Sequence, residues 1–330
     1  FLSNPLKPNI DEYFYRLGIP TVTLKDGKKY PIGRCANAIL DILIAHLKQK
    51  NVVIETSKKV IDIIKSEPYF IVITDDKEKY YAEKVVIAVG GKSAKQFGTD
   101  GTSYILAEKF GHKKTPLYPS LVQLKTDAKH IKGLKGIKEK VRISAFDGAK
   151  LLKTVCGDLL FTDYGISGDT VFALSAVLSD KKNPSVVIEF LPDIEKKDIE
   201  NMLLIRKNSG VFDDADFLNG LINKRLSKSI MKNIERFNPQ EIVESLKNFS
   251  LNITGTLGFD NSQVTKGGIS CDGINPFNMK SKYANGLYLT GEVLNIDGDC
   301  GGYNLDFAFS SGIVAARDIK NFYDLEKEKN

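Results

Sequence analysis

Apolar residues recur at helical spacing near the start of the chain. The members of this set, three or four positions apart, are Ala36, Ile39, Leu40, Leu43 and Leu47. This spacing predicts a helix over 36–47, with Asn37 as its N-cap. A second helix is expected where Ile105, Leu106 and Phe110 follow Asp100, a capping residue type, and precede Gly111.

Strand-like patterns lie between these two predicted helices. The apolar segments are KVIDIIK (59–65), YFIVITD (69–75) and EKVVIAVGG (83–91), separated by turn-forming residues. They predict a small antiparallel meander followed by a buried strand that ends in Gly-Gly.

The pattern changes twice farther along the chain. Residues 116–192 carry short β-rich runs at fairly regular intervals, which favours a barrel or a sandwich. Residues 193–247 are low in glycine and mixed in charge, as in a helical module, and GLYLTGE (286–292) predicts one last buried strand. Because the first and last segments share an α/β pattern, we expect one domain interrupted by an insertion, with the fold class α/β.

Composition excludes several classes of protein. The chain has 330 residues, 42% hydrophobic and 27% charged, with a formal net charge of +6. Lysine is spread along the chain, so a solvated surface is favoured over a nucleic-acid platform. No apolar run reaches the ~20 residues of a membrane span. The first residue is Phe1 and not Met, which suggests a fragment or a processed product.

Cysteine and histidine are sparse. Four cysteines lie far apart, with no CxxC pair and only three histidines in the chain. This argues against a zinc site or a disulfide framework and fits a reducing, cytoplasmic location. His46, His112 and His130 are expected to be structural, and no G-x-S-x-G elbow indicates a hydrolase.

The stretch GEVLNIDGDCGGYNLDFAFSSG (291–312) carries the strongest chemical signal. Its glycines precede an apolar, small-residue run that predicts a helix starting near Asn304. The unpaired N–H groups at such a start suit an anion, a phosphate or a ring that becomes negative on reduction, and Asp297 suits sugar-like hydroxyls.

Two other interpretations of this stretch were weighed. A plain strand–loop–helix connection, with glycines for geometry alone, stays open. A calcium loop does not fit, because Cys300 stands where an EF-hand needs glycine and Asp306 stands where it needs a bidentate Glu.

GGKSAKQFGTDGTSY (90–104) resembles a phosphate loop only in part. A Walker A motif needs glycine where Val86 stands, so we reject it. What remains is a Gly-Gly pair at the end of a buried strand, the place where α/β sheets bind ligands.

Six segments together resemble one flavoprotein family. They are KKYPIGRCANAILDIL, VVIAVGGKSAKQFGTDGTSYILAEKFGH, YPSLVQLKT, GDLLFTDYGISG, TGTLGFDNSQVTKGGIS and GLYLTGEVLNIDGDCGGYNLDFAFSSG. The chain is thereby similar to the bacterial NAD(FAD)-utilizing dehydrogenases, the aminoacetone oxidase-like flavoproteins. The resemblance implies an incomplete Rossmann-type FAD-binding domain, interrupted by a β-barrel and a helical insertion.

The resemblance also implies a site and a reaction. The FAD contacts carried over are Val60, Ala88, Gly90, Thr265, Gly267, Gly291, Glu292, Asp297, Gly302, Tyr303, Asn304 and Leu305. The expected enzyme is an FAD-dependent oxidoreductase that moves hydride between a small organic substrate or NAD(P)H and flavin N5. No catalytic acid or base is assigned; Tyr164 and Tyr303 are candidates for lining the substrate side.

The resemblance implies four segments. These are 1–115 (first part of the FAD-binding domain), 116–192 (β-barrel substrate domain), 193–247 (helical insertion) and 248–330 (a barrel strand and the last part of the FAD-binding domain). The family's opening strand, G-x-G-x-x-G turn and helix are expected upstream of Phe1, in roughly 70–80 residues. A flavin-free pseudoenzyme or interaction module of the same fold is the alternative, and an RNA-associated flavoprotein is a third possibility that depends on the net charge. The oligomeric state is open.

Overall fold

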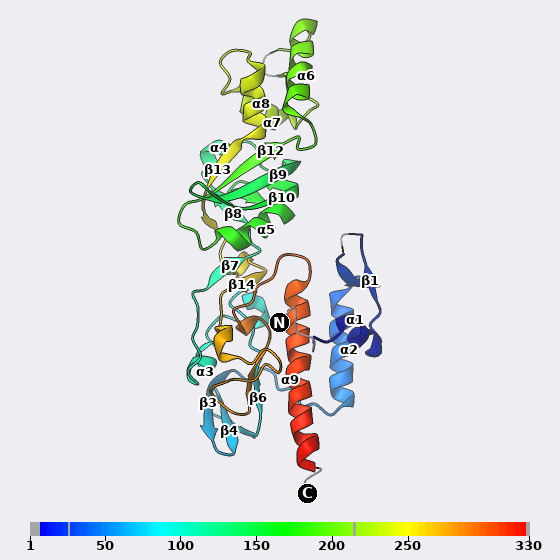
Figure 1. Cartoon of the computed structure of the whole chain (residues 1–330), viewed down its shortest axis with the longest axis vertical. Helices are drawn as coiled ribbons and strands as arrows, with labels where there is room; N and C mark the ends of the chain where they lie inside the picture. The colour runs from blue at the N-terminus through cyan, green and yellow to red at the C-terminus, as the bar shows by residue number, and fades with distance from the viewer. Residues whose placement is uncertain (1–6, 26, 214–215, 328–330) are drawn as a thin grey trace. The chain divides into compact units, whose positions relative to one another are not determined.

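The computed structural model describes residues 7–25, 27–213 and 216–327. The chain forms two compact units, which Figure 1 shows with their elements labelled. We call Phe1–Leu117 with Val264–Asn330 the α/β unit and Tyr118–Gln263 the barrel unit. The α/β unit is thus built from two separate stretches of sequence.

A parallel strand pair lies in the core of the α/β unit. Strand β6 (Val85–Ile87) pairs with β15 (Leu287–Leu289), with Leu287 opposite Val85. Both expected strands form, each with only three residues, but only β15 is buried throughout: in β6 Ile87 is buried whereas Val86 is 42% exposed. Beyond them the backbone turns at Gly90 and Gly291, both of which have positive φ, a conformation that glycine adopts without strain.

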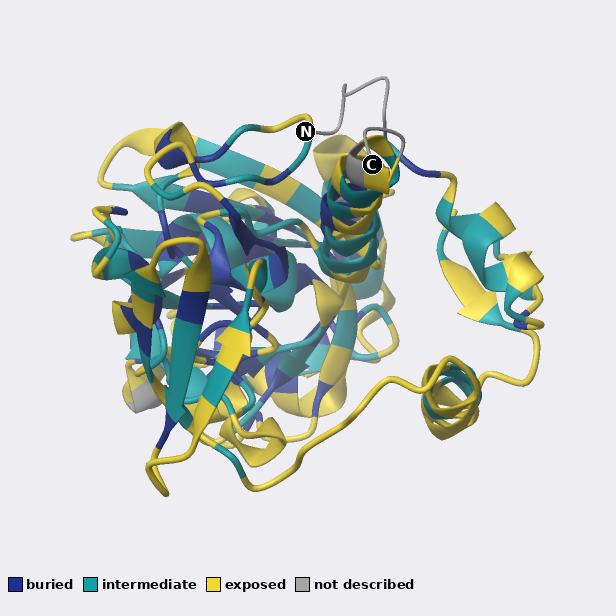
Figure 2. Ribbon diagram, turned by 90° about the horizontal axis from the view of Figure 1, so that it is seen from below, coloured by how far each residue is buried: buried dark blue, intermediate teal, exposed yellow. Residues whose placement is uncertain are grey.

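Helix α9 (Tyr303–Lys327) is the longest element of the α/β unit. Its buried residues recur three or four apart: Phe307, Ser310, Ser311, Val314 and Ala315. The other residues of the helix are intermediate or exposed, and Figure 2 shows the mixed burial along it. The Tyr288 hydroxyl of β15 donates to the Asp318 carboxylate at 2.8 Å, which ties the helix to the strand. The expected helix start at Asn304 is therefore correct within one residue.

An antiparallel meander completes the first stretch of this unit. It contains β3 (Val60–Ser66), β4 (Tyr69–Thr74) and β5 (Lys79–Ala82) in that order. Phe70 is fully buried on its inner face. The meander is confirmed, and β5 is the strand that the sequence pattern missed, because it follows directly after the charged turn at 75–79.

The remaining elements of the α/β unit are short or exposed. They are α1 (Ile10–Arg16), β1 (Thr21–Thr23), β2 (Lys29–Pro31), α2 (Ala36–Gln49), η1 (Lys95–Phe97), α3 (Ile105–Glu108), β14 (Val264–Lys266), η4 (Cys271–Gly273) and η5 (Gly291–Val293). Helix α2 confirms the expected helix and has no buried residue (Figure 2).

Both expected helix caps are wrong. The N-cap of α2 is Cys35, with no side-chain capping bond, so Asn37 already lies inside the helix. The N-cap of α3 is Tyr104, and the Asp100 carboxylate instead accepts the Thr102 N–H at 2.9 Å. Asp100 thus closes a local turn two residues ahead, a bond that short polar side chains form as readily as a cap.

The barrel unit contains a closed six-stranded barrel in the order β10-β11-β8-β13-β12-β9. Its strands are β8 (Leu124–Thr126), β9 (Lys138–Asp147), β10 (Lys150–Phe161), β11 (Gly165–Ser167), β12 (Pro184–Phe190) and β13 (Phe249–Thr256). Alternate residues are buried over 141–145 of β9 and over 186–190 of β12, the latter being Val186, Ile188 and Phe190. The structure confirms the expected α/β fold class with a β-barrel.

Helices accompany the barrel. They are α4 (Ala128–Ile131), α5 (Asp169–Leu178), α6 (Lys196–Ser209), α7 (Lys224–Met231) and α8 (Pro239–Lys247), and the unit also has β7 (Tyr118–Ser120) and η3 (Phe259–Asn261). Helices α6 to α8 occupy the segment 193–247, where helix was expected. Helix α5 was missed, because its almost wholly apolar sequence, with Val171, Leu174 and Leu178 buried, shows no clear period.

Candidate functional site

The parallel pair brings two distant loops to one edge of the α/β unit. Because β6 and β15 run in the same direction, the residues after Ile87 and those after Leu289 leave the sheet together. The Thr290 N–H donates to the Ile87 carbonyl at 3.1 Å and extends the pairing by one residue. Ala88 is exposed at this edge and Gly90 is half-buried. This is the edge where open α/β sheets bind ligands.

The loop after β15 is fastened to helix α9. The Gly291 N–H donates to Ser311 Oγ at 3.0 Å, and Ser311 is fully buried. Farther along, the Asn304 side chain makes a reciprocal pair with Gly298: its Oδ1 accepts the Gly298 N–H at 2.8 Å and its Nδ2 donates to the Gly298 carbonyl at 3.0 Å. The Asn304 side chain is therefore used to close the loop, which leaves its backbone N–H for a ligand.

Helix α9 begins directly after two glycines. Gly302 has φ +95° and its carbonyl accepts the Asp306 N–H at 2.9 Å, the first bond of the helix. A Cβ at Gly302 would meet no atom within 4 Å. Tyr303 and Leu305 are 57% and 67% exposed. Among the described residues, no side chain apart from those of the chain neighbours comes within 4 Å of a Cβ placed at Gly302, and Lys7 pairs with Asp306 in the first turn of the helix at 2.6 Å.

This arrangement fits a negatively charged or electron-accepting group. The first N–H groups of an α-helix have no partner within the helix, and the helix dipole places partial positive charge there. Here these groups belong to Tyr303, Asn304 and Leu305, in front of which the glycine loop leaves room. The half-buried Asp297 precedes them on the same loop. These residues can hold the phosphate, sugar or ring portion of a dinucleotide cofactor.

A tight polar cluster lies behind the loop. The Glu292 carboxylate accepts the Thr265 N–H at 2.6 Å. Burial raises the pKa of Glu292 above its ordinary value, and the nearby Asp297 adds to this effect, while the N–H groups of Thr265 and Gly91 counteract it. The hydroxyl of Tyr104 is buried without a partner among the described residues, and burial next to Glu292 raises its pKa. The cluster is therefore closely packed.

The two glycines of the segment TKGGIS allow close contact with neighbouring backbone. Gly267 has φ +95°, and a Cβ there would overlap the Pro116 carbonyl oxygen. A Cβ at Gly268 would lie 2.8 Å from the Val293 carbonyl oxygen. Thr265 has no exposed surface. Contact of Thr265 and Gly267 with FAD stays a prediction, and the structure supplies a separate physical reason for both residues.

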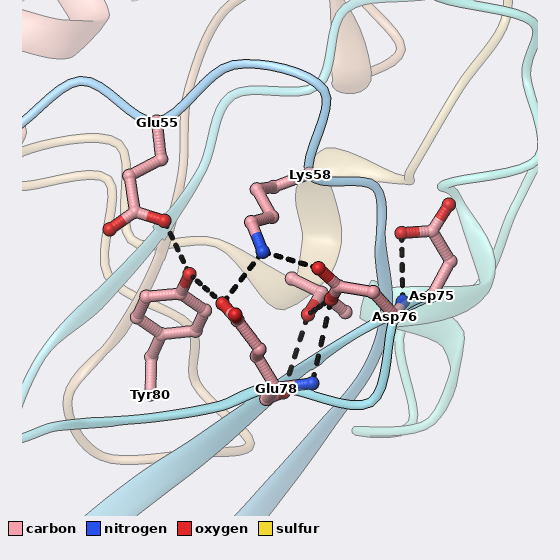
Figure 3. A network of polar contacts seen from close by, with 7 residues as sticks. Glu55, Lys58, Asp75, Asp76, Glu78 and Tyr80 are labelled. Atoms are coloured by element: carbon pink, nitrogen blue, oxygen red, sulfur yellow. Dashed lines mark hydrogen bonds and ion pairs between the residues drawn. The ribbon is translucent and has the colours of Figure 1, made fainter.

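Val60, expected near the adenine, lies at the start of β3 beside a charged network that the sequence analysis missed. In this network, drawn in Figure 3, Lys58 Nζ pairs with Asp76 and, at 2.7 Å, with Glu78. The Tyr80 hydroxyl donates to Glu55 and lies 2.8 Å from Glu78. The hydrogen bond from Lys58 lowers the pKa of Asp76 to about 2. The network ties the segment before β3 to the β4–β5 turn.

Tyr164 and the three histidines lie on other segments of the chain. Tyr164 is in the turn between β10 and β11 of the barrel unit, where its carbonyl accepts the Thr126 N–H. His46 Nε2 lies 3.0 Å from the Leu17 carbonyl oxygen, His112 is buried and His130 is exposed. Among the described residues, no group of three His, Cys, Asp or Glu side chains could hold a metal ion. No described helix has the length and apolar character of a membrane span.

Comparison with known proteins defines the class. The sequence matches the HI0933-like protein Rossmann domain over residues 3–318, so the chain belongs to this family. A 3-dehydro-bile acid delta(4,6)-reductase of Clostridium scindens is 32% identical over 322 residues, which cover 93% of this chain and 78% of the relative. The family and this relative identify the chain as an oxidoreductase.

Two further relatives share the name ribosomal RNA dihydrouridine synthase. The Escherichia coli protein is 28% identical over 300 residues, 86% of this chain and 72% of its own length. The Haemophilus influenzae protein is 29% identical over 265 residues, which cover 75% of this chain and 63% of the relative. The resemblance inferred from the motifs is thus confirmed at the level of a Rossmann family. The segment expected before Phe1 stays a prediction.

Proposed function

We propose that this oxidoreductase binds FAD at the start of α9 and uses it to reduce a small organic substrate. When bound, FAD supplies the hydride-transfer chemistry, with NAD(P)H as the electron donor. The observation that carries the proposal is the Gly301–Gly302 turn, which opens the N-terminal end of a long helix at the carboxyl edge of a parallel strand pair. Helix starts of this kind bind the charged parts of nucleotide cofactors.

The residues of the loop have separable tasks in this proposal. Asp297 holds hydroxyl groups of the cofactor's sugar-like chain. The backbone N–H groups of Tyr303, Asn304 and Leu305 face the part of the ring system that gains negative charge on reduction. The Asn304 side chain keeps those N–H groups in place through its two hydrogen bonds to Gly298. Ala88 and Gly90 present backbone at the neighbouring strand end.

The names of the relatives support the reductive direction. One is a delta(4,6)-reductase and two are dihydrouridine synthases, and each of these names describes the reduction of a double bond. We therefore propose a substrate with a reducible carbon–carbon double bond. The four free cysteines support a reducing compartment such as the cytoplasm.

Substitution at Asp297 tests the cofactor site. We expect Asp297→Ala in the natural protein to weaken FAD binding roughly tenfold or more, because hydroxyl groups lose a charged acceptor. Titration of FAD against protein fluorescence measures the change. The matched control is Asp299→Ala, two residues away on the same loop and exposed, which we expect to bind FAD like the wild type. Equal affinity of wild type and Asp297→Ala would contradict the assignment.

A second candidate is reduction of a base in RNA. It is favoured by the two ribosomal RNA dihydrouridine synthases among the relatives and by the net charge of +6. A gel-shift titration with ribosomal RNA at physiological salt separates the candidates, since nonspecific charge attraction weakens steeply with salt. Retained binding favours the RNA substrate, and its loss favours a small molecule.

A further inference from the structure

Three segments that are far apart in the sequence meet behind the proposed flavin loop. They are the turn after β6, strand β14 and the turn after β15. Thr265 Oγ1 accepts the N–H groups of Lys92 and Ser93 at 2.8 and 3.0 Å and lies 3.0 Å from the Ser93 hydroxyl. The backbone N–H of the same threonine donates to Glu292 at 2.6 Å. Thr265 therefore links the first segment to the third.

The three segments approach so closely that only glycine fits between them. A Cβ at Gly91 would lie 2.5 Å from Thr265 Oγ1 and 2.8 Å from Glu292 Oε1, well inside van der Waals contact. The Gly91 N–H also bonds to the Glu292 carboxylate. The hydrogen bonds of Thr265 and Glu292 thus hold the two strand ends together, and the absence of a side chain at Gly91 allows the ends to approach this closely.

Burial restricts what these two side chains can do. Thr265 is 0% exposed and its hydroxyl oxygen accepts two backbone N–H groups, so its side chain is held within the protein. Glu292 is half-buried and bonds inward, to the backbone of the other two segments. The hydrogen bonds of both residues therefore join segments of the protein to one another.

We propose that Thr265 and Glu292 are positioning residues, which fix the Gly90–Gly91 turn and the loop 290–298 relative to each other so that the flavin site is formed before the cofactor arrives. The inference rests on the proposed function, since it assigns the purpose of the cluster to the FAD site. It requires a hydrogen-bond acceptor at each position and no negative charge. This requirement distinguishes positioning from direct charge recognition of a ligand.

Paired substitutions test the inference in the natural protein. Thr265→Val keeps the shape but removes the acceptor, and Glu292→Ala removes the carboxylate. We expect each to weaken FAD binding about 10- to 100-fold, the effect of leaving buried N–H groups unsatisfied. Thr265→Ser and Glu292→Gln keep an acceptor oxygen, and we expect both to bind FAD as the wild type does.

A second measurement on the cofactor-free protein keeps the test decisive if a variant folds poorly. Amide hydrogen exchange of the segment 88–93 should be faster in Thr265→Val and Glu292→Ala and unchanged in Thr265→Ser and Glu292→Gln. If Glu292→Gln loses FAD as completely as Glu292→Ala while exchange is unchanged, the carboxylate contacts the ligand and the inference fails. Wild-type affinity of Thr265→Val also overturns it. Absence of FAD binding by the wild type would instead refute the proposed function.

Discussion

The buried His112 makes the stability of the α/β unit depend on pH. Its ring is 3% exposed, packs edge-on against Tyr283 and places Nε2 2.8 Å from Ser281 Oγ. Its Nδ1 has no partner among the described atoms. Burial lowers the pKa of His112 below its ordinary 6.5, because the charged imidazolium would lose its hydration.

The stability of the α/β unit should therefore fall in mild acid. Below pH 6.5 the unfolded chain takes up a proton at His112 before the folded chain does, so the stabilisation present above pH 6.5 is lost as the pH falls through the folded pKa. Urea unfolding of His112→Gln between pH 5 and 8 should show a shallower pH dependence than the wild type. The exposed His130→Gln serves as the control, and a wild-type slope in His112→Gln would contradict the account.

At the residue scale, the sequence pattern placed the glycine loop and the start of the following helix along the chain but did not indicate the bonds within the loop, and FAD binding by this loop stays a prediction. Asp297, Gly302 and Tyr303 lie where the pattern placed them. The contact between Ser93 and Thr265 spans 172 positions, and nothing in the local pattern of either segment indicates it. The caps expected at Asn37 and Asp100 were wrong because capping depends on the backbone angles of one residue, which spacing alone does not determine.

At the scale of elements, one buried lysine joins helix α8 to the end of strand β12. Lys247 Nζ donates to Glu189 at 3.0 Å and to the Leu191 and Ile194 carbonyls, both at 2.7 Å. Burial works against the charge of Glu189, but the hydrogen bonds from Lys247 and Arg142 outweigh it and hold its pKa below the ordinary value. The Lys247 ammonium group thus donates to one carboxylate and two backbone carbonyls, and the carboxylate also accepts a hydrogen bond from Arg142.

Replacing Lys247 should destabilise the barrel unit strongly. Lys247→Met leaves the half-buried Glu189 with Arg142 as its remaining donor and removes the ammonium group from the Leu191 and Ile194 carbonyls, at a cost of about 1–3 kcal/mol. Lys196→Met is the matched control, because it breaks an ion pair between Lys196 of α6 and Glu244, which lies on α8 like Lys247. The Lys196 side chain is 55% exposed, so we expect a loss of about 0–1 kcal/mol in the free energy of unfolding. Urea unfolding measures both, and similar losses would show that burial does not govern the difference.

Elements with a strong period were predictable, and short ones were not. The buried positions of α9 follow the 3.6-residue period, whereas β3 and β4 were predictable from their runs of β-branched and aromatic residues, since their burial does not alternate strictly. Strand β5 and the three-residue β1 and β2 are too short for a period to stand out. Half of the residues of α5 are buried, but further apolar residues between them mask the helical spacing of Val171, Leu174 and Leu178 in the sequence.

At the scale of the whole molecule, the sequence indicated an α/β fold interrupted by a barrel. The change from helical to alternating patterns near residue 116 and the return of glycine-rich loops after Leu257 suggested this organisation. Closure of the barrel was not predictable, because it depends on pairing β10 with β11 and β8 with β13, which the chain pattern does not specify. The start of α9 was predictable from the apolar, small-residue run after the glycines, and its role as a cofactor site stays a prediction that rests on the N–H groups a helix start leaves unpaired.

The visible absorption spectrum of the natural full-length protein tests the central claim most directly. The protein is incubated with excess FAD, freed of unbound cofactor by gel filtration, and analysed for flavin released on denaturation. If the start of α9 holds FAD, the purified protein shows the bands of oxidised flavin and releases FAD in a stoichiometric amount. A colourless, folded protein after this treatment would contradict the claim and favour a flavin-free module of the same fold.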